Sequence, residues 1–99
     1  MSKSIDRIKN IEHGFKDILA VGDSILADTS LDHINLAKAY LEDEKCQMRM
    51  LATHVLGQLS SSNPEALKLL ETKVAADDNW RVQEMLAKAF DAYCRAKGY

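Results

Sequence analysis

The chain has 99 residues, a formal net charge of −2 at pH 7, and a composition that is 46% hydrophobic and 28% charged. This length allows one small domain, and the composition excludes an intrinsically disordered chain. No apolar run approaches the roughly 18 residues that span a bilayer, and the N-terminus lacks the apolar core of a signal peptide. We therefore expect no membrane association and a cytoplasmic location.

The charge is distributed unevenly along the chain. Residues 1–44 carry five Lys or Arg and nine Asp or Glu, whereas residues 45–99 carry eight and six. A strong nucleic-acid binder usually has a clear basic excess or a basic stripe. Since the second half has only a slight excess, we expect any binding of DNA by this chain to be weak.

The N-terminal segment predicts a helix over about residues 4–19 or beyond. Its apolar residues recur at helical intervals and are Ile5, Ile8, Ile11, Phe15, Ile18 and Leu19. Gly14 and Gly22 weaken this helix, because glycine costs about 1 kcal/mol relative to alanine inside a helix, and two shorter helices are the alternative. The break that follows offers Thr29 or Ser30 as the N-cap of the next helix.

Four further helices are predicted, near residues 31–42, 45–60, 64–76 and 79–96. Asn63 and Pro64 suit the cap and the first position of the third of these, and the run from Ser62 to Glu65 also fits a capping box. Gly98, after a basic last turn, ends the fourth. There is no strand pattern and no nucleotide-binding loop, so the sequence predicts an all-α fold of about five or six helices.

The two longest of these helices repeat each other at an offset of 34 residues. The first carries an apolar stripe of Met48, Leu51, Ala52, Val55, Leu56 and Leu59. Adding 34 gives Val82, Met85, Leu86, Ala89, Phe90 and Tyr93, which are apolar or aromatic too. A fixed period with helical patterning is typical of a stacked helical repeat array. The predicted units, about 31–61 and 64–97, each contain a shorter outer helix, an Asp-rich turn and a longer inner helix, with Leu56 and Phe90 at equivalent buried sites.

The end of the array needs a cover, because terminal repeats normally have a polar outer face. The last helix is among the most apolar of the chain, and only Tyr99 lies beyond its glycine stop. We expect residues 1–99 to form a single domain that is the N-terminal part of a longer array. The alternative is that the last helix pairs with a protein partner or with a second copy of the chain.

Cysteine and histidine give no sign of a metal or a cofactor. Cys46 and Cys94 lie far apart without a CxxC motif, which predicts two buried, reduced thiols. His13, His33 and His54 share no ligand spacing and are interpreted as surface or partly buried structural residues. We therefore expect no metal site and no cofactor.

Two helix starts carry a resemblance to a known family. The runs Asp78-Asn79-Trp80-Arg81-Val82-Gln83-Glu84-Met85-Leu86-Ala87-Lys88-Ala89-Phe90 and Cys46-Gln47-Met48-Arg49-Met50-Leu51-Ala52 resemble the inner helices of HEAT-type repeats. The stretch over residues 77–94 is more specifically similar to the HEAT-like DNA alkylation repair family, which includes alkylpurine DNA glycosylases. The resemblance covers about residues 31–97.

The resemblance implies a surface and a chemistry. In this family the inner helices line a concave, basic surface that grips duplex DNA, and aromatic and acidic groups stabilise the cationic alkylated nucleotide without a metal. Trp80 and Glu84 lie four residues apart and provide such a pair, although active members use an aspartate, and Asp91 is a second acidic candidate. The alternatives are that Trp80 packs on the neighbouring repeat and that both acids are solvated surface charges.

A basic stripe is predicted from the same helices. The residues expected to contact DNA are Lys45, Arg49, Trp80, Arg81 and Lys88. The alternative is an ordinary solvated helix surface, with Glu84 paired to Lys88 at i+4.

Three classes of function remain open: DNA repair, a protein-binding scaffold and a homodimeric assembly module. We favour a DNA-binding, alkylation-repair-like protein that excises alkylated bases in its full-length form, with a non-catalytic scaffold for protein interaction as the alternative. The 99-residue chain alone is expected to be inactive, because two repeats cannot neutralise the six or more phosphates that a firm grip on duplex DNA requires.

Overall fold

The structure of the chain is a computed structural model that describes residues 15–98. Its elements are, in order, α2 (Phe15–Ala27), α3 (His33–Leu41), α4 (Cys46–Leu59), α5 (Pro64–Leu69), the π-helix η1 (Leu70–Val74) and α6 (Trp80–Lys97). No strand occurs within these residues, and the predicted all-α repeat fold is confirmed. The predicted helical segment before Phe15, with His13 and Gly14, lies outside the described residues.

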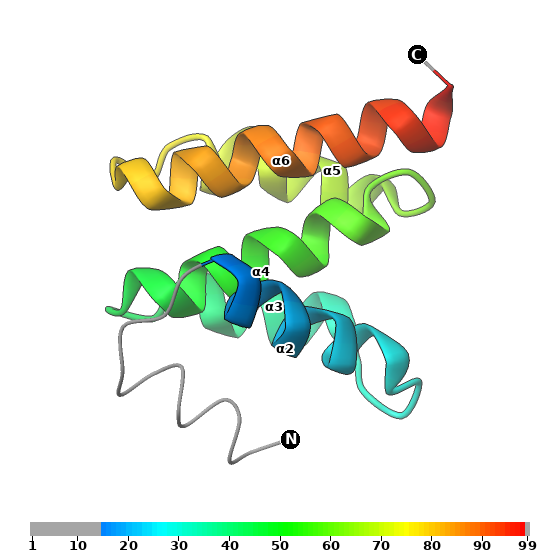
Figure 1. Cartoon of the computed structure of the whole chain (residues 1–99), viewed down its shortest axis with the longest axis horizontal. Helices are drawn as coiled ribbons and strands as arrows, with labels where there is room; N and C mark the ends of the chain where they lie inside the picture. The colour runs from blue at the N-terminus through cyan, green and yellow to red at the C-terminus, as the bar shows by residue number, and fades with distance from the viewer. Residues whose placement is uncertain (1–14, 99) are drawn as a thin grey trace.

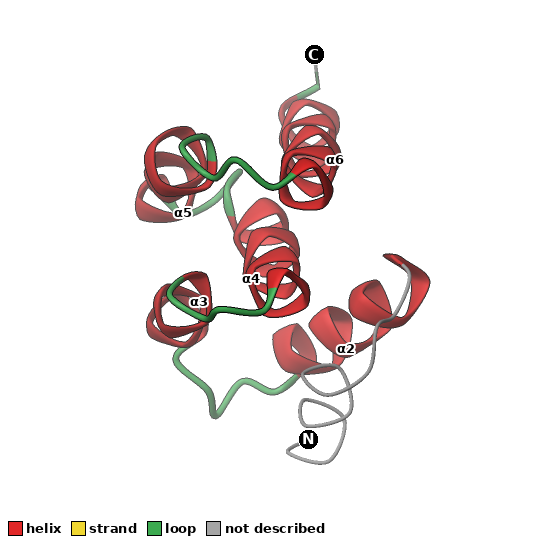
Figure 2. Ribbon diagram, turned by 90° about the vertical axis from the view of Figure 1, so that its left-hand side faces the viewer, coloured by secondary structure: helices red, strands yellow, loops and turns green. Residues whose placement is uncertain are grey.

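The helices form two layers. Figure 2 shows α3 and α5 on one side and α4 and α6 on the other, with α2 beside α4. The central helix α4 packs against α2, α3 and α6 (Figure 1). Because α3–α4 and α5–η1–α6 are consecutive helix pairs, the outer and inner helices predicted for the two units are found in that order. We call the surface formed by α2, α4 and α6 the inner face.

None of the helices described between residues 15 and 98 has both the length and the apolar character needed to cross a membrane.

Helix α2 continues through Gly22, so the alternative of two shorter helices divided at this glycine does not occur. The glycine is instead required by the packing of α2 against α4. A Cβ atom at position 22 would collide with the His54 ring of α4. The His54 Nε2 atom in turn lies 2.9 Å from Oδ1 of Asp23, the residue after the glycine. Gly22 therefore lets α2 approach α4 closely enough for this contact.

The N-cap of α3 is Asp32, not Thr29 or Ser30 as predicted. The Asp32 carboxylate accepts a hydrogen bond from the backbone N–H of Asn35 at 3.2 Å. Ser30 is instead held in the preceding turn, where its N–H and hydroxyl both donate to Oδ1 of Asp28. These two hydrogen bonds favour the charged carboxylate and lower the pKa of Asp28.

The second outer helix begins as predicted at Pro64, with the Asn63 side chain accepting from the N–H groups of Glu65 and Ala66. The Ser62 hydroxyl donates to the Leu59 carbonyl, so Ser62 is not the cap and the predicted capping box does not form. The helix widens after six residues into the π-helix η1. The predicted glycine stop is confirmed as well: α6, whose N-cap is Asn79, ends at Gly98 with φ +81°.

The core lies where α4 meets its neighbours. The most fully buried large side chains are Ile18, Ile25, Met48, Leu51, Leu56, Leu70, Val74, Val82 and Met85. Leu56 is completely buried as predicted, but its repeat equivalent Phe90 is only partly buried, so the expectation of two equivalent buried sites is wrong for Phe90. The reason is position: α4 lies between two other inner-face helices, whereas among the helices described α6 has only α4 beside it on that face (Figure 2).

Candidate nucleic-acid interface

Helix α6 carries a stripe of charges of alternating sign. Its cations, Arg81, Lys88 and Arg95, are spaced seven residues apart, and its acids, Glu84 and Asp91, lie between them. Seven residues are close to two helical turns, so the three cations share one side of the helix at steps of about 10.5 Å. All five lie at least partly exposed, which leaves their charged groups accessible to a partner.

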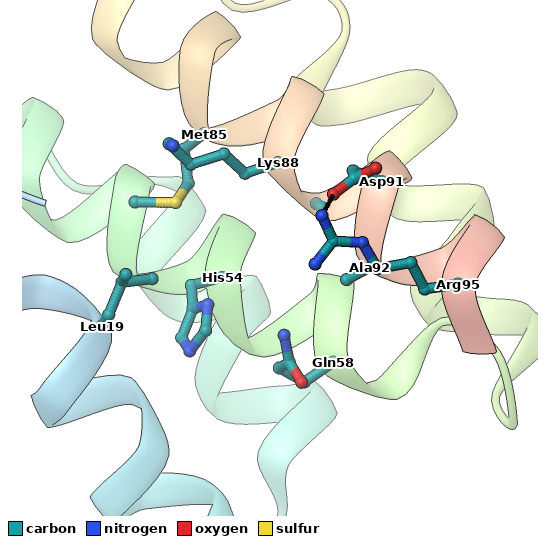
Figure 3. A pocket seen from close by; sticks show the side chains of 9 residues that line it. Leu19, His54, Gln58, Met85, Lys88, Asp91, Ala92 and Arg95 are labelled. Carbon is teal, nitrogen blue, oxygen red and sulfur yellow. Dashed lines mark ion pairs between the residues drawn. The ribbon is translucent and has the colours of Figure 1, made fainter.

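The C-terminal part of this stripe, from Lys88 to Arg95, borders a hollow in the inner face between α4 and α6 (Figure 3). The hollow has a volume of about 330 Å³. Its lining combines apolar and polar side chains, namely Leu19, His54, Gln58, Met85, Lys88, Ala89, Asp91, Ala92 and Arg95. Two of the polar lining residues, Gln58 and Arg95, were not among the site residues predicted from the sequence. The seven-residue spacing of Arg81, Lys88 and Arg95 could have indicated Arg95.

The two predicted acidic candidates lie on the exposed side of α6. Asp91 forms an i, i+4 ion pair with Arg95 on the helix surface, with its Oδ2 atom 2.9 Å from Nη2 of the guanidinium. Glu84 is exposed one turn after Trp80. An acid paired with a cation on an open surface is well solvated, and this arrangement offers no desolvated carboxylate of the kind that general acid–base chemistry favours.

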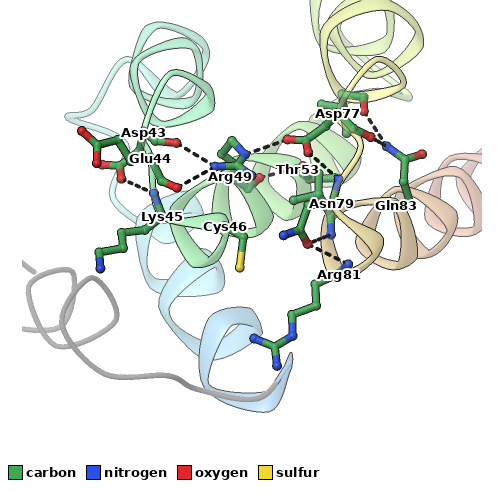
Figure 4. Close-up of polar contacts among 12 residues, drawn as sticks. Asp43, Glu44, Lys45, Cys46, Arg49, Thr53, Asp77, Asn79, Arg81 and Gln83 are labelled. Atoms are coloured by element: carbon green, nitrogen blue, oxygen red, sulfur yellow. Dashed lines mark hydrogen bonds and ion pairs between the residues drawn. The ribbon is translucent and has the colours of Figure 1, made fainter.

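Arg49 is held inside the fold, at the junction of the two repeats (Figure 4). Its Nε atom donates to Oδ2 of Asp77 at 2.7 Å, and its Nη1 atom donates to the carbonyls of Asp43 and Glu44, both at 2.9 Å. The side chains of Arg49 and Asp77 are only 19% and 13% exposed. The guanidinium that was expected to contact a phosphate is thus committed to the interface between the repeats.

The 34-residue offset explains this network. Gln83 stands at the repeat position of Arg49, and its amide donates to the Asp77 carbonyl, as Arg49 donates to the carbonyl of the equivalent Asp43. Both aspartates also accept a hydrogen bond from the backbone N–H two residues later, at 2.9 Å in each repeat. The offset was available from the sequence, but it does not show the contact of Arg49 with Asp77, which reaches into the next repeat.

Two of the other predicted DNA-contact residues lie together where α6 begins. The Arg81 guanidinium carbon lies 5.3 Å from the centre of the Trp80 ring, a cation–π distance. Trp80 is 67% exposed, so the alternative in which it packs into the neighbouring repeat is wrong. Lys45 is exposed directly before α4, and Figure 4 shows it at the same end of the molecule as Arg81.

The cysteines and histidines have structural surroundings. Cys46 and Cys94 are free thiols as predicted, but both are partly exposed rather than buried. The ring of His33 contacts the Asp28 carbonyl at 2.9 Å, and His54 is 8% exposed beside Asp23. These contacts agree with the interpretation of His33 and His54 as structural residues.

The repeat geometry and the comparisons with known proteins agree. Stacked pairs of outer and inner helices, joined by equivalent Asp-containing turns, define a HEAT-like helical repeat protein. No family model matches the sequence, and no curated protein matches it. Among solved structures, the chain is similar to the crystal structure of AlkD2 from Streptococcus mutans, with 36% sequence identity and a TM-score of 0.81.

This match covers 99% of the chain, and it confirms the predicted relationship: the chain is a relative of AlkD2, a HEAT-like DNA alkylation repair protein. The chain spans about half the length of that structure, since the match covers 49% of it.

Proposed function

We propose that this chain binds duplex DNA through its inner face, as part of a DNA alkylation repair protein whose longer form excises alkylated bases. The observation that supports this most directly is the similarity to AlkD2, a HEAT-like DNA alkylation repair protein, over nearly the whole chain at 36% identity. Binding of DNA is a proposal for this chain, and excision is a further step that would need groups beyond its two repeats.

The α6 stripe is the part of the inner face that we propose contacts the DNA backbone. Cations at steps of about 10.5 Å along a straight helix can each contact a separate phosphate. Lys45, directly before α4, adds a further exposed cation at the end of the molecule where Arg81 lies. The intervening Glu84 and Asp91 offset much of this charge, and we therefore expect a low affinity with a strong salt dependence.

The exposed Trp80 supports a role in the same contact. A tryptophan with 67% of its surface in water, held beside a guanidinium, presents a flat apolar face next to a positive charge. Aromatic faces stack on nucleobases, and such stacking contributes about 1–3 kcal/mol per base. The same pair is also a common anchor in protein interfaces, so a protein-binding scaffold is the second candidate function.

The test is a binding titration of the 99-residue chain with a fluorescent duplex of about 20 base pairs at 20–200 mM salt. We expect weak binding that falls steeply with salt, and a reduction of the salt slope by about one when Arg81 is replaced by glutamine. Lys68→Gln is the matched control, because it removes one positive charge from an exposed position of the outer helix α5. Absence of binding at the lowest salt would reject the proposal and favour the scaffold.

A further inference from the structure

The hollow between α4 and α6 differs from the rest of the charged stripe, because side chains of a second helix face it as well. Arg95 and Lys88 line it from α6 and Gln58 lines it from the facing helix α4, with Arg95 and Gln58 toward one end and the amine of Lys88 beside Met85 at the other (Figure 3). Leu19, Met85 and Ala92 contribute apolar surface to its lining. Two cations and a neutral amide that can donate hydrogen bonds therefore surround a cavity of about 330 Å³.

This arrangement suits an anion that carries several acceptor oxygens. Arg presents a planar set of N–H donors that matches a phosphate, Lys adds a compact charge, and the Gln58 amide adds a donor from the opposite wall. Asp91 is the unfavourable member of the lining, but its carboxylate is paired with Arg95, whose Nη2 atom lies 2.9 Å from Oδ2. The ion pair uses the Nη2 end of the guanidinium, and the other N–H groups of Arg95 can donate to a different acceptor.

From this geometry we propose that the hollow is a phosphate subsite, which takes one backbone phosphate of a DNA strand between Arg95 and Gln58, with Lys88 at its far end beside the neighbouring phosphate. The proposal rests on the proposed binding of DNA by the inner face, and it assigns the best-formed contact to this hollow. Asp91 is then a positioning residue for Arg95 that also lowers the affinity for the anion, and not a catalytic acid.

Three variants test the subsite by titration with the fluorescent duplex at low salt. Arg95→Gln removes a phosphate contact, and we expect an affinity at least fivefold lower with a salt slope reduced by about one. Gln58→Glu places a carboxylate in the hollow and should weaken binding to a similar extent. Asp91→Asn removes the competing charge and should tighten binding severalfold.

Matched controls separate the site from the overall charge. Lys68→Gln and Ala75→Glu make the same changes of net charge at exposed positions of the outer layer, and each should change the affinity by less than twofold. Inorganic phosphate identifies the source of the anion. If it displaces the duplex no better than chloride at equal ionic strength, the site requires a strand, whereas efficient competition would indicate a site for a free anion and overturn the proposal.

The outcomes also distinguish this inference from the proposed function. Suppose that the unchanged chain binds the duplex, and that Arg95→Gln and Gln58→Glu bind it no more weakly than their controls do. This result would overturn the subsite and leave the proposed DNA binding intact. Failure of the unchanged chain to bind duplex at 20 mM salt would reject both.

Discussion

At the scale of single residues, the contacts of Arg49 show how one side chain joins two repeats. It donates to two carbonyls of its own turn and to the carboxylate of Asp77 in the next turn, in a largely buried setting. A charge in such a place is stabilised only while its partners remain, and removal of one partner leaves the other poorly satisfied.

We therefore expect Arg49→Met to lower the free energy of unfolding by about 1–3 kcal/mol, because Asp77 and two carbonyls lose their donor. Urea denaturation followed by circular dichroism measures the change. Lys73→Met is the control: its 2.6 Å ion pair with Glu42 is exposed on the outer layer, and such pairs contribute about 0–1 kcal/mol. Equal losses for the two variants would contradict the structural role given to Arg49.

A second prediction at this scale concerns the core. Leu56 is completely buried, and its replacement by alanine should cost about 2–5 kcal/mol, enough to unfold a domain this small. Phe90→Ala is the natural comparison, because the two residues occupy equivalent repeat positions but Phe90 is only partly buried. We expect a clearly smaller loss of stability for Phe90→Ala in the same denaturation experiment, and the reverse order would be inconsistent with the burial described here.

At the scale of elements, α4 and α6 approach each other closely where Gly57 faces Ala89. A Cβ atom on Gly57 of α4 would lie 2.6 Å from the Cβ and 2.9 Å from the Cα of Ala89 in α6. One of these two atoms belongs to the backbone, so α6 as a whole must move if position 57 is enlarged.

We expect Gly57→Ala to lower the free energy of unfolding by about 1–3 kcal/mol, as overpacking of a tight core does, despite the better helix propensity of alanine. Adding Ala89→Gly should restore part of the loss, because it removes one of the two atoms in collision. Thermal unfolding of the single and double variants measures this coupling. A stabilised Gly57→Ala variant would show that the helices are not in close contact.

The helices and their order could be predicted from the sequence, because apolar periodicity and the 34-residue offset report directly on buried faces. The cap of α3 was missed, since several residues near Ser30 can cap and only the turn built on Asp28 decides among them. The close approach at Gly57 could not be foreseen either, because the glycine has no local signal and its role depends on Ala89, 32 residues away. Site prediction was limited in the same way: Arg49 was recognised as a cation, but its partner in the next turn is a tertiary contact.

At the scale of the whole molecule, the described structure has one inner face with a modest excess of positive charge and an exposed tryptophan at its edge. Much of the apolar stripe of α6 is covered, since Val82, Met85, Leu86 and Ala89 are buried, while Phe90 and Tyr93 remain partly exposed. The buried residues of the stripe reduce the apolar area available for self-association. Pairing with a second copy through Phe90 and Tyr93 stays a prediction, and sedimentation at increasing protein concentration tests it.

The prediction for activity belongs to this scale. We expect the 99-residue chain to release no alkylated purine from methylated duplex DNA above the uncatalysed rate, because its acids are solvated and its charge cannot hold several phosphates at physiological salt. The freed base is measured by chromatography, with an active alkylpurine glycosylase as the positive control. Release of base by this chain alone would contradict the prediction, and its loss in Glu84→Gln or Asp91→Asn would identify the acid responsible.

The missing side chain at Gly57 has a consequence for the shape of a longer array. The inner helices meet there at backbone distance, whereas the outer layer is joined by long side chains, in the pairs Lys38–Glu65 and Lys73–Glu42. A stack whose units lie closer on one side than on the other must bend toward that side. The curvature of such an array is then set in part by a single absent methyl group, and we expect any larger residue at this position to straighten it.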